Sequence, residues 1–201
     1  YALREGMEPA VANAIRDHYR PQGADDVVPD ELVSAVVAVA DRIDTLVGCF
    51  GIGLVPSGSA DPFALRRAAL GIIRIALEGP LDIDVRALVD QAYGAYEGDA
   101  ELRPNEEVRA SLGEFFRGRI RAMLKDQHGG DVVDACLGAW DGSSIRDLRT
   151  RIEAVGELRQ APEFEALAVA FKRAFNITKE SARGSVDSSL LEAGAETDLA
   201  E

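Results

Sequence analysis

The chain has 201 residues, 47% of them hydrophobic, which is enough to form a core for one large domain or two small ones. Its apolar runs, such as residues 32–39, are far shorter than the roughly 20 residues of a membrane-spanning helix, so we expect a soluble globular protein and exclude a membrane protein. The formal net charge of −13 argues against a uniformly basic nucleic-acid-binding surface.

The charge is distributed unevenly along the chain. Residues 1–110 carry 10 basic and 19 acidic side chains, whereas residues 111–183 carry 12 and 11. Residues 184–201 carry five acidic side chains and no basic ones. A near-neutral stretch with clustered basic residues can face a phosphate backbone, and composition alone leaves this open. The cluster comprises Arg117, Arg119, Arg121 and Lys125.

Helical periodicity is present along nearly the whole chain. No alternating pattern around Asn-Gly or Asp-Gly indicates a β-hairpin, so the predicted fold class is all-α. The first predicted helix covers residues 8–19, and Pro21 with Gly23 ends it. The second begins at Pro29 and runs to about Phe50, with an apolar stripe broad enough to be buried on most sides.

Asp61 marks the predicted start of the third helix. Asp61 is expected to be the N-cap and Pro62 the first helical residue, and Gly79 with Pro80 ends the helix. Five further helices follow from the same periodicity. They cover residues 84–96, 106–125, 132–140, 144–155 and 162–178.

Residues 97–106 contain Gly, Asp, Pro and Asn and mark the best candidate boundary between two subdomains. The predicted parts are a helical domain over residues 1–98 and a second helical subdomain over residues 105–183. Residues 184–201 have no sustained apolar period, so we expect an acidic flexible tail. The chain opens at Tyr1, in what reads as the end of a helix, which predicts a piece of a longer protein.

The sequence contains none of the common catalytic signatures. It has no Walker loop, no Rossmann glycine pattern, no paired-cysteine zinc motif and no Gly-x-Ser-x-Gly elbow. Cys49 and Cys136 are far apart in apolar stretches, which favours reduced, buried thiols over a disulfide or a zinc site. We therefore assign no catalytic residue and no metal ligand.

Asp44 lies beside the apolar stripe of the second predicted helix, where a carboxylate needs a hydrogen bond, an ion pair or a bound ligand. With Asp41 one turn before it and with His18, it could belong to a metal or phosphate site, as in a metal-dependent phosphohydrolase. We favour the structural alternative, in which these side chains form ion pairs with arginines. The candidate partners are Arg16, Arg42 and Arg66.

Two arginines, Arg66 and Arg67, fall in the first turns of the third predicted helix. Helix N-termini favour anions, so this pair, with Arg74 two turns beyond Arg67, could form a phosphate-binding corner. Equally, one of the pair could bind Asp41 or Asp44 and hold two helices together. The spacing alone does not decide between these interpretations.

Residues 40–53, ADRIDTLVGCFGIG, and residues 56–71, PSGSADPFALRRAALG, closely resemble the signature block of the glycyl-tRNA synthetase beta subunit family. Weaker similarity extends through residues 14–21 and 164–173. The resemblance implies an internal or C-terminal piece of that subunit, with an HD-like helical domain first and the start of an anticodon-binding domain from about Leu112. The His-Asp pair that gives HD phosphohydrolases their name is not in the chain.

The resemblance further implies a cytoplasmic ligase of two alpha and two beta subunits that charges tRNA(Gly) with glycine at the expense of ATP. The alpha subunit would bind ATP, Mg and glycine, whereas the beta subunit would supply most tRNA contacts. The expected partners are therefore tRNA(Gly), the alpha subunit and a second beta subunit, and neither a membrane nor DNA. This piece is expected to need no cofactor of its own.

Phosphate contacts are expected at basic side chains on the predicted helices. Two other functions remain open: an HD-type phosphohydrolase using His18, Asp41 and Asp44, and a structural scaffold that docks the alpha subunit through exposed Leu and Val side chains. The predicted tRNA-binding residues are Arg66, Arg67, Arg117, Arg121, Lys172 and Arg173.

Overall fold

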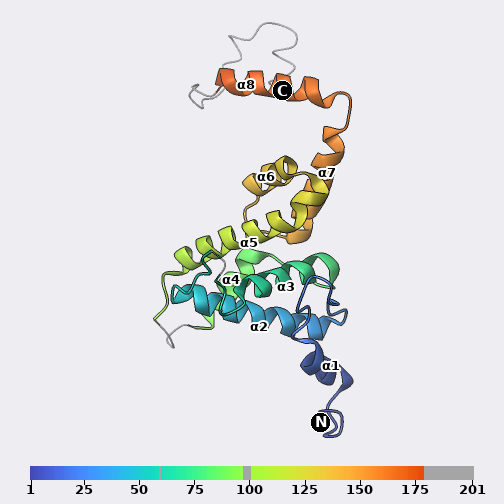
Figure 1. The fold of residues 1–201 in the computed structure, drawn as a ribbon, viewed down its shortest axis with the longest axis vertical. Coiled ribbons are helices and arrows are strands. Elements are labelled where there is room, and N and C mark those ends of the chain that lie inside the picture. The colour runs from blue at the N-terminus through green and yellow to red at the C-terminus, as the bar shows by residue number, and fades with distance from the viewer. Residues whose placement is uncertain (59, 97–100, 179–201) are drawn as a thin grey trace, which may run out of the picture. The chain divides into compact units, whose positions relative to one another are not determined.

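The computed structural model describes residues 1–58, 60–96 and 101–178, which form eight α-helices and no strand, only isolated β-bridges (Figure 1). The predicted all-α class is thereby confirmed, whereas the HD-like assignment stays a prediction. None of the described helices combines the length and apolar character needed to cross a membrane. The helices are α1 (Pro9–Asp17), α2 (Leu32–Gly51), α3 (Leu65–Glu78), α4 (Val85–Gly94), α5 (Asn105–His128), α6 (Gly130–Ala139), α7 (Ile145–Arg159) and α8 (Phe164–Thr178).

The chain divides into two compact units, Tyr1–Glu157 and Leu158–Glu201. The first unit holds α1 to α6 and nearly all of α7, and α8 lies in the second. Within the first unit the core continues across the predicted boundary near residue 100, because α5 packs against α2, α3 and α4. A division into two family domains at that point stays a prediction, and the predicted acidic tail lies outside the described residues.

The central helix of the first unit is α2, which packs against α1, α3, α4 and α5. Small side chains at Ala35 and Ala38 are fully buried and let neighbouring helices approach closely, and Leu46 and Phe50 fill the core further along. The opposite side of the first two turns is exposed, however, so the apolar stripe is not buried on most sides. The exposed apolar residues there are Leu32, Val33, Val36 and Val37.

Helix α3 begins at Leu65, later than the predicted start at Asp61 and Pro62. The Asp61 carboxylate does accept hydrogen bonds from helix N–H groups, those of Leu65 (2.8 Å) and Arg66 (3.0 Å). Between them, Ala64 adopts a left-handed conformation with φ 54°, which stops the helix from extending back to Pro62. The N-cap residue is Ala64, so the prediction of Asp61 as N-cap and Pro62 as first helical residue was wrong, although the Asp61 carboxylate does bind the first N–H groups of the helix.

Helix α5 is the longest helix of this unit, and the later helices α6 and α7 share its core. The side chain of every fourth residue is buried, so one stripe, which winds slowly around the helix, faces the core. Helices α6 and α7 add their own buried residues to the same core, among them Val133, Leu148 and Ile152. The buried stripe of α5 consists of Val108, Leu112, Phe116, Ile120 and Leu124.

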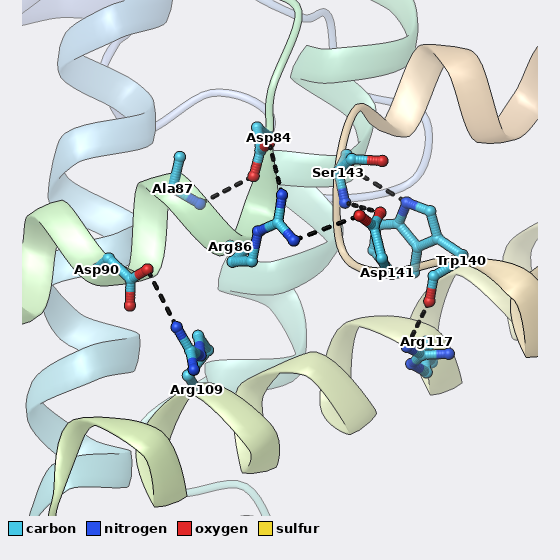
Figure 2. Close-up of polar contacts among 9 residues, drawn as sticks. All are labelled: Asp84, Arg86, Ala87, Asp90, Arg109, Arg117, Trp140, Asp141 and Ser143. Atoms are coloured by element: carbon cyan, nitrogen blue, oxygen red, sulfur yellow. Dashed lines mark hydrogen bonds and ion pairs between the residues drawn. The ribbon is translucent and has the colours of Figure 1, made fainter.

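The loop between α6 and α7 is joined to the start of α4 (Figure 2). The backbone N–H of Arg86 donates to the carbonyl of Gly142 (3.1 Å), and that of Ile145 donates to Ile83 (3.1 Å). The Arg86 guanidinium also reaches the Asp141 carboxylate at 3.3 Å. These contacts join segments about 60 residues apart in sequence.

Candidate nucleic-acid interface

Arg66 holds the loop that precedes α3. Its guanidinium donates to the carbonyl oxygens of Gly58 (2.6 Å) and Ala60 (3.2 Å), while its backbone N–H is bound by Asp61. The side chain is half-buried. Arg66 therefore shapes the N-terminus of α3 through backbone contacts and does not pair with Asp41 or Asp44, as one of the two interpretations of the sequence required.

Arg67, the next residue, is in a different position. Its side chain is exposed and forms no hydrogen bond or ion pair with any other residue that the structure describes. It lines two hollows, one of about 640 Å³ beside α3 and α5 and one of about 290 Å³ between α2, the start of α3 and residues 19–22. A guanidinium without an internal partner keeps its donors available for a phosphate.

The larger hollow is lined by α3, α5, α7 and the loop of residues 21–24. Two further arginines lie on its wall. Arg74 forms an ion pair with Glu78 (2.7 Å) and donates to the carbonyls of Gly23 (2.9 Å) and Asp26 (2.8 Å). Arg149 forms an ion pair with Glu153 at 2.8 Å. In the predicted phosphate-binding corner, Arg66 and Arg74 thus bind other groups of the chain. Arg67 is the member of the three without a partner among the described residues.

Arg117 reaches from α5 to the end of α6 (Figure 2). It donates to the carbonyl oxygens of Leu137 (2.6 Å) and Trp140 (2.5 Å), and its guanidinium lies 5.6 Å from the centroid of the Trp140 ring. The carbonyls at a helix C-terminus lack partners within the helix, so a cation that binds them caps α6. This half-buried arginine, predicted as a tRNA contact, has a structural task in the fold.

Arg121, one turn further along α5, binds the carboxylate of Asp134 on α6 through two hydrogen bonds of 2.5 and 2.9 Å. The hydrogen bond from Arg121 lowers the pKa of Asp134, and the same contact raises the pKa of Arg121. A phosphate would have to share or displace this carboxylate. The charge of Arg121, a predicted tRNA contact, is therefore neutralised by Asp134 within the chain.

Lys172 and Arg173 lie on α8, in the second compact unit. Both side chains are exposed and have no polar partner among residues 1–58, 60–96 and 101–178. They remain available for a polyanion. Of the six predicted residues, the fold brings Arg66 and Arg67 together on α3 and Arg117 and Arg121 together on α5.

The alternative metal site is not assembled as the sequence suggested. The Nδ1 atom of His18 lies 2.9 Å from the carbonyl oxygen of Ile15, and Asp41 and Asp44 are both exposed. No group of three or more His, Cys, Asp or Glu side chains in the described part of the chain could hold a metal ion.

Asp41 and Asp44 also form no ion pair with any residue that the structure describes, so the expected pairs with arginines are not formed. Arg16 binds its neighbour Asp17 at 2.6 Å, and Arg42 and Arg66 bind backbone carbonyls. Asp44 lies on an exposed side of α2, where water solvates its carboxylate, so it needs no cation. The prediction that Asp44 requires a buried partner was therefore wrong.

Asp44 instead contacts Tyr96. The Tyr96 hydroxyl donates to the Asp44 main-chain oxygen at 3.2 Å. Burial and, after it, the hydrogen bond with Asp44 raise the pKa of Tyr96 to about 12. The same hydroxyl occupies the space above Gly48, where an added Cβ would lie 2.7 Å from it. This contact fixes the chain after α4 against α2.

Arg42 has a structural role that the sequence analysis did not predict, because it was expected to form an ion pair with Asp41 or Asp44. Its guanidinium is buried and donates to the carbonyls of His18 (2.7 Å), Tyr19 (2.8 Å), Pro21 (3.2 Å) and Ala38 (2.8 Å). Burial lowers its pKa. The signal in the sequence was its position inside the apolar stripe of α2. Arg42 thereby fixes the loop that forms one wall of the Arg67 hollows.

The two cysteines, Cys49 and Cys136, are both free and partly buried. Burial raises the pKa of each thiol. Neither thiol is fully buried, so the prediction of buried thiols was wrong, and their reduced state stays a prediction.

The family model of the glycyl-tRNA synthetase beta subunit matches residues 1–138. The chain is 45% identical over 196 residues to the glycine–tRNA ligase beta subunit of Geobacter metallireducens, which covers 98% of this chain and 28% of that protein. It is 46% identical over 200 residues to the corresponding protein of Syntrophotalea carbinolica, covering 99% of this chain and 29% of the relative.

A third relative, the glycine–tRNA ligase beta subunit of Desulforamulus reducens, is 42% identical over 201 residues, again covering 29% of its length. The chain thus spans less than a third of the length of these curated relatives. The matched residues 1–138 include the signature block of residues 40–71, with Arg42, Arg66, Arg67 and Gly71. The chain belongs to the glycyl-tRNA synthetase beta subunit family.

Proposed function

We propose that this chain is a helical part of a glycine–tRNA ligase that contributes tRNA contacts and tetramer assembly to the ATP-dependent charging of tRNA(Gly). Activation of glycine, with ATP and Mg, takes place on the alpha subunit in this proposal, and the chain itself contributes no catalytic residue. The observation that carries the proposal is the family membership of residues 1–138, since the matching relatives are glycine–tRNA ligase beta subunits.

The exposed cations support a specific distribution of the tRNA contacts. Three of the six predicted residues are engaged inside the fold: Arg66, Arg117 and Arg121. The other three, Arg67, Lys172 and Arg173, have no such partner among the described residues. An arginine that binds an internal carboxylate or carbonyl loses that interaction when it binds a phosphate. Phosphate binding is therefore more favourable at cations without such a partner. We therefore assign phosphate contacts to Arg67, Lys172 and Arg173.

The test is the salt dependence of tRNA(Gly) binding by the purified chain and its Arg67→Gln variant, measured by fluorescence anisotropy at several salt concentrations. Each phosphate contact contributes about 0.9 to the slope of log K against log salt concentration. We expect Arg67→Gln to weaken binding and to lower this slope by about that amount. Arg4→Gln is the matched control, because Arg4 is also exposed and lines neither hollow beside Arg67.

Two results would count against the proposal. If the unaltered chain did not bind tRNA(Gly) at low salt, its role in tRNA binding would be wrong. If it bound but Arg67→Gln and Arg4→Gln behaved alike, the assignment of Arg67 would be wrong while the function stood.

The assembly role is supported by the exposed apolar side of α2. Leu32, Val33, Val36 and Val37 are 58%, 45%, 49% and 39% exposed, although they follow one another along a single face of two turns. Val36 also lines a mainly apolar hollow of about 610 Å³ between α2 and α4. Contiguous apolar surface of this kind marks a protein interface. We assign this surface to the alpha subunit, and a second beta subunit is the competing occupant.

The phosphohydrolase alternative receives less support. Its candidate residues His18, Asp41 and Asp44 do not converge: the histidine contacts a backbone carbonyl and both carboxylates face solvent. A purely structural scaffold is compatible with the α2 surface but gives no reason why Arg67, which has no partner in the described part of the chain, lies at the edge of a large hollow.

A further inference from the structure

The hollow of about 640 Å³ between α3, α5, α7 and residues 21–24 has the size of a ligand pocket. Pockets that hold small organic groups measure roughly 300–1,000 Å³ and combine an apolar lining with a few polar groups. All of its walls belong to the first compact unit. It therefore lies wholly within one compact unit of the fold.

The floor of this hollow is apolar. Leu70 and Leu77, two turns apart on α3, face Met123 and Leu124 of α5. Met123 is half-buried, so part of its side chain is open to the hollow. The thioether sulfur of methionine makes favourable contacts with aromatic rings. A flat aromatic group with one polar edge, such as a nucleobase, fits this surface chemically.

The charges around the hollow favour a single negative group. Arg74 and Arg149 line it, but each is already paired with a carboxylate, at Glu78 and Glu153. Arg67 is the lining cation that has no partner in the described ranges. The net charge of −13 makes the chain as a whole repel a polyanion. A phosphate is therefore expected to bind beside Arg67, next to the apolar lining of the hollow.

We propose that this hollow binds one unstacked nucleotide of an RNA, with the base on the floor of Leu70, Leu77 and Met123 and the phosphate on Arg67. The inference rests on the proposed function, because tRNA is the source of the nucleotide. A base inside a duplex is stacked on its neighbours and cannot enter a hollow, whereas single-stranded ends and loops present splayed bases. The geometry thus selects an unpaired part of the RNA.

The two methionines of the chain make this testable at the level of a single contact. Met123 lines the hollow, whereas Met7 is 52% exposed and lies outside it. With ¹³C-methyl-labelled methionine, each residue gives its own NMR signal, and Met7→Leu identifies which is which. A base placed over Met123 shifts that methyl signal upfield through its ring current and leaves the Met7 signal in place.

The probes are a short single-stranded oligoadenylate, a short blunt-ended RNA duplex, and ribose 5-phosphate, which carries the phosphate without a base. We expect a saturable upfield shift of Met123 with the oligoadenylate and with neither of the other two. Arg67→Gln should weaken the oligoadenylate affinity about tenfold, as the loss of a single good contact does.

A second pair of variants tests the hollow itself. Ala122 lines it and is exposed, so Ala122→Glu places a carboxylate at its mouth without touching Arg67 or the floor. Ala110, also exposed and on the same helix α5, gives the matched control Ala110→Glu, with the same change of charge outside the hollow. We expect the Met123 shift to be lost in Ala122→Glu and kept in Ala110→Glu.

The outcomes separate this inference from the proposed function. If tRNA(Gly) binds but the Met123 signal does not move, or moves equally in Ala122→Glu and Ala110→Glu, the nucleotide site is wrong and the proposed function stands. If Met123 responds to the oligoadenylate while tRNA(Gly) is not bound, the site stands and the proposed function is wrong. An equal response to ribose 5-phosphate would reduce the site to a phosphate contact and overturn the base-binding part.

Discussion

The guanidinium of Arg42 passes directly over Gly71, so closely that a Cβ at residue 71 would lie 2.5 Å from its Nε atom and 3.0 Å from its Cδ atom. Gly71 is in the middle of α3, where glycine is unfavourable for helix stability. The close approach explains its presence: α2 and α3 are held together with a buried arginine between them, and only a residue without a side chain leaves room for it.

We therefore expect Gly71→Ala to destabilise the fold, by about 1–3 kcal/mol, because the added methyl group must displace a side chain that holds four backbone carbonyls. The measurement is the free energy of unfolding in urea. Gly113→Ala is the matched control: Gly113 is also inside a helix, but nothing lies within 4 Å of its added Cβ. There the better helix propensity of alanine should stabilise by about 0.5–1 kcal/mol. A neutral or stabilising Gly71→Ala would show that the Arg42 contact is loose.

The second prediction concerns Arg42 itself. Arg42→Met keeps the length of the side chain but leaves the carbonyls of His18, Tyr19 and Pro21 without their donor. Each unsatisfied buried polar group costs about 1–3 kcal/mol, and water can reach part of this loop, so we expect a total loss of about 2–4 kcal/mol in unfolding free energy. Arg42→Lys should recover part of the loss, because its ammonium group can still donate.

Arg109→Met provides the comparison for an arginine that is partly exposed. Arg109 pairs with Asp90 at 3.4 Å with 43% of its side chain exposed, and such surface pairs contribute about 0–1 kcal/mol (Figure 2). If both methionine variants lost the same stability, the assignment of Arg42 as the organiser of the loop would have to be abandoned.

The sequence was sufficient to predict the helices because their signals are local. The buried stripe of α5 recurs on every fourth residue, and the predicted range 106–125 differs from Asn105–His128 by a few residues at the ends. The late start of α3 was missed because the left-handed conformation of Ala64 leaves no mark in the residue types.

The site was less predictable, because the availability of an arginine depends on which groups the tertiary structure brings near it. Arg66 and Arg67 are neighbours of the same type, yet one donates to the carbonyl of Gly58 and the other has no partner among the described residues. Arg117 and Arg121 looked like a basic cluster, but α6 supplies a carbonyl of Leu137 and the carboxylate of Asp134 to them. These partners lie 13 to 20 residues away and cannot be read from helix position alone.

The third prediction is a pH dependence that originates at Asp17. This buried carboxylate is bound by Arg16 at 2.6 Å and by Arg20 at 3.3 Å, and the hydrogen bond from Arg16 lowers its pKa. A carboxyl group whose pKa is lowered in the folded state stabilises it above the ordinary value of about 3.9, and this contribution is lost as the pH falls through the folded pKa.

We expect Asp17→Asn to be less stable than the unaltered chain near neutral pH, with the difference shrinking as the pH is lowered below about 4. Urea unfolding at a series of pH values measures this directly. Arg16→Gln should remove most of the same pH dependence, since it removes the principal cause of the shift. A difference between Asp17→Asn and the unaltered chain that stayed constant over this range would show that the ion pair contributes nothing to folding.

The last prediction concerns the exposed apolar surface of α2. Val36→Glu places a charge on the side chain that is 49% exposed and lines the hollow between α2 and α4. In an interface with the alpha subunit this charge would be buried without a partner, so we expect at least about a tenfold loss of affinity, equivalent to about 1.4 kcal/mol. The fold should be unaffected, because the residue is exposed in the chain alone.

The measurement is the mass of the complex formed with the alpha subunit in light scattering after size-exclusion chromatography. Thr45→Glu is the control: it is exposed on the same helix and lies outside the apolar group of residues 32–37. A loss of self-association in Val36→Glu, with alpha-subunit binding intact, would assign the surface to a second beta subunit. If Val36→Glu kept both alpha-subunit binding and self-association, this surface would serve neither interaction. A carboxylate buried without a partner in an apolar interface weakens binding measurably.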